Sequence, residues 1–143
     1  RHLTDAFREM AGFTGSSAEL LRKFLHRWWT QYGGTPAAGL TKLMVSEAAN
    51  FPELAQYYQD EVVGPSHELL RRVVRRGIER GEFRPVDVPQ LVHLIVAPLV
   101  QMATWRYSLA PCCPSAQQID PPALIELHAD LLVRALSTEK PTP

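Results

Sequence analysis

The sequence predicts an all-α protein of about six helices, folded as a single domain over residues 1–143. Apolar residues recur at helical spacings along most of the chain. Proline and glycine stand where these segments begin and end, and no strand-like alternation, internal repeat or low-complexity tract interrupts them. With 143 residues, 45% of them apolar, the chain can bury roughly two thirds of its unfolded surface.

Two helices are expected at the start of the chain. The apolar stripe Leu3, Phe7 and Met10 indicates a helix that the chain enters partway. Ser16 and Glu19 then form a capping-box pattern, in which each side chain satisfies an unpaired amide at the start of a second helix. The apolar face of this second helix consists of Leu20, Leu21, Phe24, Leu25, Trp28, Trp29 and Tyr32.

A long bent helix is predicted in the middle of the chain. Thr35-Pro36 supplies the cap and first-turn proline of a third helix. Pro52 then begins the long helix, Gly64-Pro65 bends it, and Gly81 ends it. The arginines on the outer face of its second half are Arg71, Arg72, Arg75, Arg76 and Arg80. We expect this face to be solvated, with ion pairs from Glu68 at four-residue spacing.

The last two helices are predicted from two further caps. Asp87 with Gln90 opens a fifth helix that is apolar nearly all round as far as Trp105. Asp120-Pro121 begins the final helix, and the tail over residues 138–143 is expected to be disordered. Because the fifth helix is apolar on more faces than one small domain covers, we predict a homodimer in which each of these two helices meets its own copy. The expected interface is Leu91, Ile95, Leu99, Met102, Leu124, His128, Leu131 and Ala135.

Patterns for catalysis or metal binding are missing from the sequence. The five histidines lack the spacings that place two metal ligands on one helical face, and no Cys-x-x-Cys pair occurs. There is no Gly-x-Ser-x-Gly elbow and no glycine-rich phosphate loop. Adjacent Cys112 and Cys113 are expected to be unreactive loop thiols, with a thiol sensor as the alternative. We therefore expect no enzymatic activity, no metal and no cofactor.

Charge and hydropathy predict a soluble cytoplasmic protein. Fifteen basic residues balance fifteen acidic ones, so no overall field attracts the chain to nucleic acid or to an anionic membrane. The longest uninterrupted apolar run, Leu94 to Val100, is far shorter than the ~18 residues of a membrane span. Two neighbouring cysteines fit a reducing compartment better than secretion.

A ligand pocket is expected where the bent helix cannot pack flush against straight neighbours. Its predicted lining is Phe24, Trp28, Met44, Tyr58, Val62, Gln101 and Trp105. The rings would supply apolar contact, while Gln101 and the Tyr58 hydroxyl would orient the ligand. Since no acid or base is evident to neutralise a full charge, the ligand is expected to be small, mainly hydrophobic and uncharged.

Two short strings resemble a known family. Phe51-Pro52-Glu53-Leu54 opens the long central helix, and Gly81-Glu82-Phe83-Arg84-Pro85 closes it. Comparable strings occur at these places in the C-terminal domain of TetR/AcrR-type transcriptional regulators, and the resemblance extends from about Leu40 to Trp105. It implies an effector-sensing domain of a repressor, with the last two helices and their copies forming the dimer as a four-helix bundle and the effector controlling DNA binding.

The resemblance also implies operator DNA as a partner, through an N-terminal helix-turn-helix domain. Nothing before Leu3 can hold such a domain, so the expectation is a regulatory domain alone that binds duplex DNA weakly by itself. The residues leave two alternatives open. One is a ligand-free helical dimerisation module with a filled core, and the other is a helical-bundle enzyme with a titratable pair in its pocket.

Overall fold

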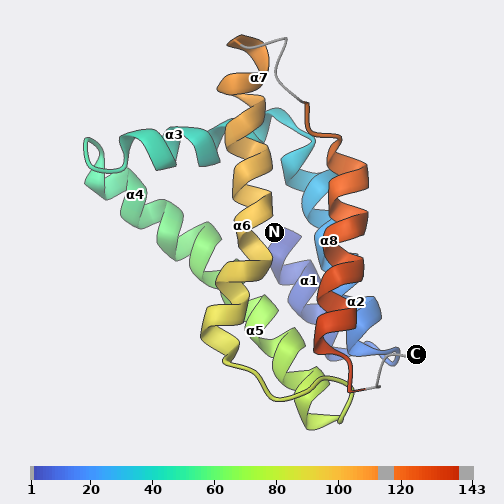
Figure 1. Ribbon diagram of the computed structural model, residues 1–143. Helices are drawn as coiled ribbons and strands as arrows, with labels where there is room; N and C mark the ends of the chain where they lie inside the picture. The colour runs from blue at the N-terminus through green and yellow to red at the C-terminus, as the bar shows by residue number, and fades with distance from the viewer. Residues whose placement is uncertain (1, 113–117, 139–143) are drawn as a thin grey trace.

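The structure is a computed structural model that describes residues 2–112 and 118–138 (Figure 1). Its α-helices are α1 (His2–Ala11), α2 (Ser17–Trp28), α3 (Gly39–Glu47), α4 (Pro52–Tyr58), α5 (Gly64–Glu79), α6 (Val88–Arg106), α7 (Leu109–Cys112) and α8 (Pro121–Leu136). The described residues contain no strand, apart from an isolated bridge between Phe83 and Ser137. The all-α prediction is confirmed. The expectations for residues 139–143 and for Cys113 lie outside the described residues.

Three of the four predicted caps accept a hydrogen bond from a backbone amide of the first turn of their helix; the exception is Thr35, whose side chain makes no capping bond and which precedes a 3-10 turn. These bonds run to Ser16 Oγ from Glu19 N at 3.1 Å, to Asp87 Oδ1 from Gln90 N at 3.2 Å, and to Asp120 Oδ1 from Ala123 N at 3.3 Å. Each bond satisfies one of the four amides that a helix start leaves unpaired. The starts of α2, α6 and α8 are therefore determined locally.

Two turns depart from α-helical geometry and adopt π-helical geometry. One, Trp29–Gly33, continues α2, and the other, Gln59–Val63, joins α4 to α5. Each closes on a glycine: the amide of Gly34 donates to Trp29 O at 2.7 Å, and that of Gly64 donates to Gln59 O. The predicted long central helix is thus α4, a π-helical turn and α5, with the irregular turn directly before Gly64-Pro65.

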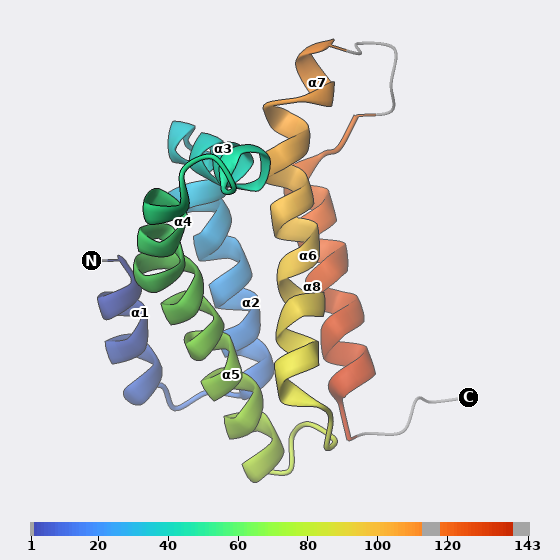
Figure 2. The same ribbon diagram turned by 90° about the vertical axis from the view of Figure 1, so that its left-hand side faces the viewer.

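The core lies among α2, α5, α6 and α8, which run together in Figure 2 with α1 outside, against α5. Its buried members are Leu20, Leu21, Leu25, Leu70, Val73, Val74, Phe83, Val92, Ile95, Leu99, Met102, Ile125, Ala129 and Leu136. At the end of the molecule opposite the α5–α6 connection, α3 and α4 extend away from this bundle (Figure 1). In the described residues of α4 no side chain is buried.

The connection from α5 to α6 explains much of the Gly81–Pro85 string. Gly81 adopts φ +74°, a conformation that ends α5 and that other residues rarely adopt. The ring of Phe83, only 3% exposed, packs directly on Gly77, where an added Cβ would lie 2.1 Å from the ring. Arg84 fastens the connection to the end of α8, since its amide donates to Leu136 O at 2.8 Å.

The stretch Val88–Cys112 is long and apolar enough, by length and composition alone, to cross a membrane. The core helix of a globular domain meets the same criterion. Here Val92, Ile95, Leu99 and Met102 of this stretch are buried in the protein core. Its apolar composition is accounted for in part by that burial.

Candidate functional site

Three hydroxyl groups from three separate elements meet next to the two π-helical turns. Tyr32 belongs to the turn after α2, Thr41 to α3, and Tyr58 ends α4. The Thr41 hydroxyl lies within hydrogen-bonding distance of Tyr32 and 2.9 Å from the Tyr58 hydroxyl, whereas the two tyrosine hydroxyls are 3.4 Å apart. We call these three residues the hydroxyl cluster.

The hydroxyl cluster is uncharged. Burial raises the pKa of Tyr58 well above its usual range, and the hydrogen bond from Thr41 offsets this only in part. Charged side chains do not contribute to this pKa shift; the remaining causes come from Tyr32. The Tyr58 phenol therefore acts as a neutral hydrogen-bonding group.

Aromatic rings pack beside the hydroxyl cluster. The ring centroid of Trp28 lies 6.1 Å from that of Tyr32 and 6.4 Å from that of Trp29, both with tilted planes. Gly33 makes this arrangement possible, because a Cβ there would lie 2.4 Å from the Trp28 ring. The guanidinium of Arg106 donates to Gly33 O at 3.0 Å and so ties this turn to α6. An apolar wall and a polar, neutral cluster thus stand side by side, which is the composition of many small-molecule sites.

The other pocket residues predicted on α2, α3 and the central helix have mixed placements. Met44 is buried on α3, and Val62 is half-buried in the π-helical turn that follows Tyr58. Phe24 is half-buried and lines a hollow of about 30 Å³ between α1, α2 and α5. A second hollow, of about 290 Å³, lies beside Glu82 and Phe83, at the other end of α2 and α5 from the hydroxyl cluster. Neither hollow is lined by Trp28 or Tyr58.

Gln101 differs from its predicted setting. Gln101 is exposed, so its amide is not a buried group in need of a ligand. Trp105, four residues later, lies on the same side of α6, and its indole nitrogen is buried without a hydrogen-bond partner among the described residues. The reason is that α6 is apolar nearly all round, and periodicity does not indicate which side of such a helix faces the protein interior.

A second candidate surface is the outer side of α6 and α8, which contact each other. Three leucines are exposed on these two helices: Leu94 on α6 at 66%, and Leu127 and Leu131 on α8 at 55% and 57%. Leu127 and Leu131 are four residues apart and share one helical face. In the described structure this surface is a set of large apolar side chains open to solvent.

The predicted interface residues divide between this surface and the core. Leu131 and Ala135 are exposed, and Leu91 and Leu124 are half-buried. By contrast, Ile95, Leu99 and Met102 are buried within the chain's own core, and His128 Nε2 lies 2.8 Å from Ile95 O. Ile95, Leu99 and Met102 leave little exposed area for a partner, because the face of α6 that carries them covers α2 and α5. The sequence analysis missed Leu94 and Leu127, although the four-residue spacing of Leu127 and Leu131 was a visible signal.

The arginine face of α5 is only partly solvated. Glu68 pairs with Arg71 at 3.0 Å and with Arg72 at 3.2 Å, as the spacing predicted. Arg76 instead turns toward the connection between α1 and α2, where it donates to Ser17 Oγ at 2.7 Å and to Gly15 O at 2.8 Å. Expecting Arg76 to be solvated was therefore wrong, because sequence spacing does not reveal which carbonyl groups lie opposite.

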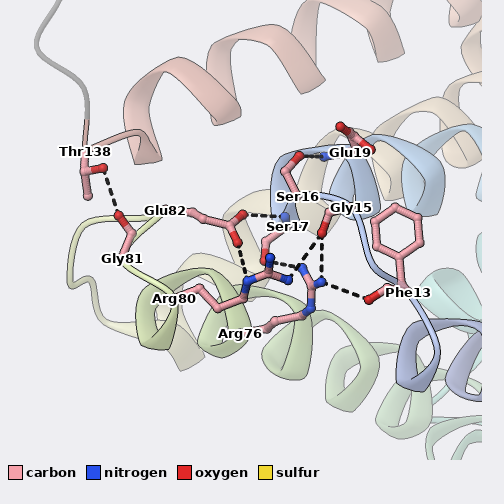
Figure 3. A network of polar contacts seen from close by, with 10 residues as sticks. All are labelled: Phe13, Gly15, Ser16, Ser17, Glu19, Arg76, Arg80, Gly81, Glu82 and Thr138. Carbon is pink, nitrogen blue, oxygen red and sulfur yellow. Dashed lines mark hydrogen bonds and ion pairs between the residues drawn. The ribbon is translucent and has the colours of Figure 1, made fainter.

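Figure 3 shows the contacts around Arg76, which we call the arginine network and which comprises Phe13, Gly15, Ser17, Arg76, Arg80 and Glu82. Arg76 also donates to Phe13 O at 3.1 Å. Glu82 accepts from the amide of Ser17 at 2.5 Å and pairs with Arg80 at 2.8 Å. The network joins the start of α2 to the end of α5 through charged groups and backbone.

A histidine pair lies where α5 meets α6. The rings of His67 and His93 stand edge to face with centroids 5.5 Å apart. Partial burial lowers the pKa of His67 below its ordinary value, and the nearby His93 and Arg71 lower it further. Groups of three or more metal-ligating side chains do not occur among the described residues.

These features define an all-helical domain with an aromatic and hydroxyl-lined region at one end and an exposed apolar surface on its last long helices. Residues 13–110, well over half of the chain, match the family described as "Tetracyclin repressor-like, C-terminal domain". The chain belongs to this family of TetR-type regulator domains. Comparisons with curated proteins and with solved structures find no match.

Proposed function

We propose that this chain is the effector-sensing and dimerisation domain of a TetR-like repressor that works in the cytoplasm. A small, hydrophobic, uncharged ligand binds beside Trp28, Met44 and Tyr58, and its binding alters how an N-terminal helix-turn-helix domain engages operator DNA. Family membership supports the regulatory role. The neutral hydroxyl cluster beside the indole rings supports the choice of ligand class.

The observation that carries the homodimer is the exposure of Leu94, Leu127 and Leu131 on two helices that contact each other. Large apolar side chains gathered on one surface mark an interaction site more often than scattered single ones do. Two antiparallel helices that meet their own copies about a two-fold axis would cover these leucines in a four-helix bundle.

The matched substitutions Leu131→Glu and Leu99→Glu test this arrangement. Leu131 is exposed in one chain, so Leu131→Glu is expected to leave a folded monomer, because the charge would lose solvent only in the dimer. Leu99 is buried in the core, so Leu99→Glu is expected to unfold the chain. Light scattering and circular dichroism distinguish the two outcomes. A monomeric unaltered chain would refute the homodimer.

One observation favours a second candidate, a dimerisation module that takes no ligand. Neither the hollow beside Phe24 nor the one beside Glu82 is lined by Trp28 or Tyr58. A ligand at the aromatic end must therefore displace side chains, whereas a module without a ligand would keep them packed. Ligand titration of the unaltered chain, designed in the next subsection, separates the two candidates.

A further inference from the structure

We propose that the hydroxyl cluster Tyr32–Thr41–Tyr58 is the group that selects the ligand, and that it selects a neutral molecule carrying a hydroxyl group on a flat apolar body. This inference rests on the proposed function and names the chemical class of its ligand. The observation behind it is that three hydroxyls from three elements meet in a half-buried place beside two tryptophan rings.

The hydrogen-bonding capacity of the hydroxyl cluster determines what it accepts. Three hydroxyl groups carry three protons, and each oxygen also offers acceptor positions. The two contacts made by Thr41 use two protons at short distances, whereas the contact between Tyr32 and Tyr58 is 3.4 Å long. Hydroxyl-to-hydroxyl bonds are best at about 2.7–2.8 Å, so this third contact is the weak one.

A ligand hydroxyl fits this weak contact because it both donates and accepts. Inserted between the phenol oxygens of Tyr32 and Tyr58, it would accept from one and donate to the other, closing a ring of four hydroxyls. A ligand that only accepts could take a proton from one phenol but could not donate to the other, which would keep only its contact with Thr41. A ligand group with no polar atom would break the contact between the Tyr32 and Tyr58 hydroxyls without replacing it. This is unfavourable because the loss of a buried hydrogen-bond partner costs free energy.

A charged ligand is disfavoured at the same place. The pKa of Tyr58 is raised chiefly by burial, and no lysine, arginine or carboxylate contributes to the shift. The Arg106 guanidinium is already bonded to Gly33 O and lies over the ring of Tyr107, 5.2 Å from its centroid. An anion next to the phenols would thus lose hydration without gaining a charged partner.

The backbone around the cluster can adapt to an entering ligand. Tyr32 lies within the π-helical turn Trp29–Gly33, and Tyr58 directly precedes the turn Gln59–Val63. Such turns contain one residue more than an α-helical turn and occur frequently at functional sites. Since both phenols are attached to these turns, a small change in either turn would widen the gap between their oxygens.

The test uses four probes with one ring system: 2-naphthol, 2-methoxynaphthalene, naphthalene and 2-naphthoate. Binding to the full chain near neutral pH is measured by tryptophan fluorescence and calorimetry. We expect 2-naphthol to bind about three- to tenfold more tightly than its methyl ether, the range that one net hydrogen bond contributes. Naphthalene is expected to bind more weakly than 2-naphthol, and 2-naphthoate is expected to bind most weakly of the four.

Two variants remove parts of the hydroxyl cluster. Tyr58→Phe deletes one phenol oxygen, and Thr41→Val deletes the central hydroxyl and serves if the first variant folds poorly. Each is expected to abolish the preference for 2-naphthol over 2-methoxynaphthalene. The matched control is Tyr57→Phe, on the same helix but exposed, which should keep the preference. Thermal unfolding confirms that each variant is folded.

The outcomes separate this inference from the proposed function. If the probes bind and Trp28→Ala weakens them all, but Tyr58→Phe and Thr41→Val keep the preference for 2-naphthol, the hydroxyl cluster is not the selecting group and the sensing function stands. Tighter binding of 2-naphthoate than of 2-naphthol also overturns the inference. If none of the four probes binds the unaltered chain, both are overturned and the ligand-free module is the better account.

Discussion

The two ends of α2 and α5 are held together by different kinds of interaction. Where α2 begins and α5 ends, the arginine network joins charged side chains to backbone carbonyls of the α1–α2 connection. Where α2 ends and the central helix passes from α4 to α5, the hydroxyl cluster joins three neutral groups, and the adjoining backbone is π-helical. One end is fixed by charge and backbone, the other by hydroxyls on irregular turns.

Burial differs between the same two ends. α5 buries Leu69, Leu70, Val73, Val74 and Gly77, whereas the described residues of α4 and of the turn Gln59–Val63 include none that is buried. Few buried contacts allow a segment to open at low free-energy cost. The end with the hydroxyl cluster is therefore expected to open at lower free-energy cost than the end with the arginine network.

The largest expected effect comes from removing a buried aromatic ring from the core, at the point where the α5–α6 connection packs. Phe83→Ala removes the ring that covers Gly77 and should lower the free energy of unfolding by about 3–5 kcal/mol. Phe51→Ala, at an exposed position just before α4, should cost less than about 1 kcal/mol. Urea unfolding of both variants measures the difference. Equal losses would mean that the two ends are packed alike.

A smaller effect is expected from Arg76→Ala, which removes bonds to Ser17, Gly15 and Phe13. Because these bonds join a charged group to partly buried acceptors, the loss should be about 1–3 kcal/mol. Hydrogen exchange should speed up in the α1–α2 connection and stay unchanged near Tyr58. Arg75, exposed on the same helix, provides the matched control. Arg75→Ala should change neither the free energy of unfolding nor the exchange in the α1–α2 connection. A uniform increase in exchange would contradict two separately held ends.

The smallest expected effect concerns His67, at the boundary between the two ends. Its pKa is lowered by burial, by His93 and by Arg71, so the unfolded chain takes up a proton at higher pH than the folded chain does. Stability contributed by neutral His67 is therefore present above about pH 6.5 and is lost as pH falls below it. Unfolding measured across this range should show a slope that His67→Gln reduces. An unchanged slope in His67→Gln would mean that His67 does not cause the pH dependence of stability.

Local chemistry made the helices predictable. Ser16, Asp87 and Asp120 cap helices in the structure as their sequence patterns indicated, and Gly81 ends α5 with positive φ. Such signals depend on residues within one turn of each other, so a single sequence contains them in full. The central helix was likewise identifiable from Pro52 and Gly64-Pro65, and the family match agrees with the resemblance seen in the same strings.

The candidate site was less predictable from the sequence. Trp28 and Tyr58 were predicted to line a pocket, and each contacts Tyr32 in the structure. Tyr32 and Thr41 were not predicted to line it, since their hydroxyls meet that of Tyr58 only when α2, α3 and α4 are in place. Gln101 was assigned to a buried pocket and is exposed. Ile95 and Leu99 were assigned to the dimer interface, but they are buried in the chain's own core. Both errors have one cause: the periodicity of α6 does not indicate which of its sides faces the core.

The sequence by itself determined where helices begin and end, that the protein is all-α, and to which family it is similar, because caps, breakers and apolar periodicity act over three or four residues. Only the tertiary structure decided which side of α6 faces the core, which carbonyls Arg76 reaches, and that three hydroxyls form one cluster. The contacts of Arg76 and of the hydroxyl cluster join residues 9–63 positions apart in the chain, and no local pattern records which group will lie opposite.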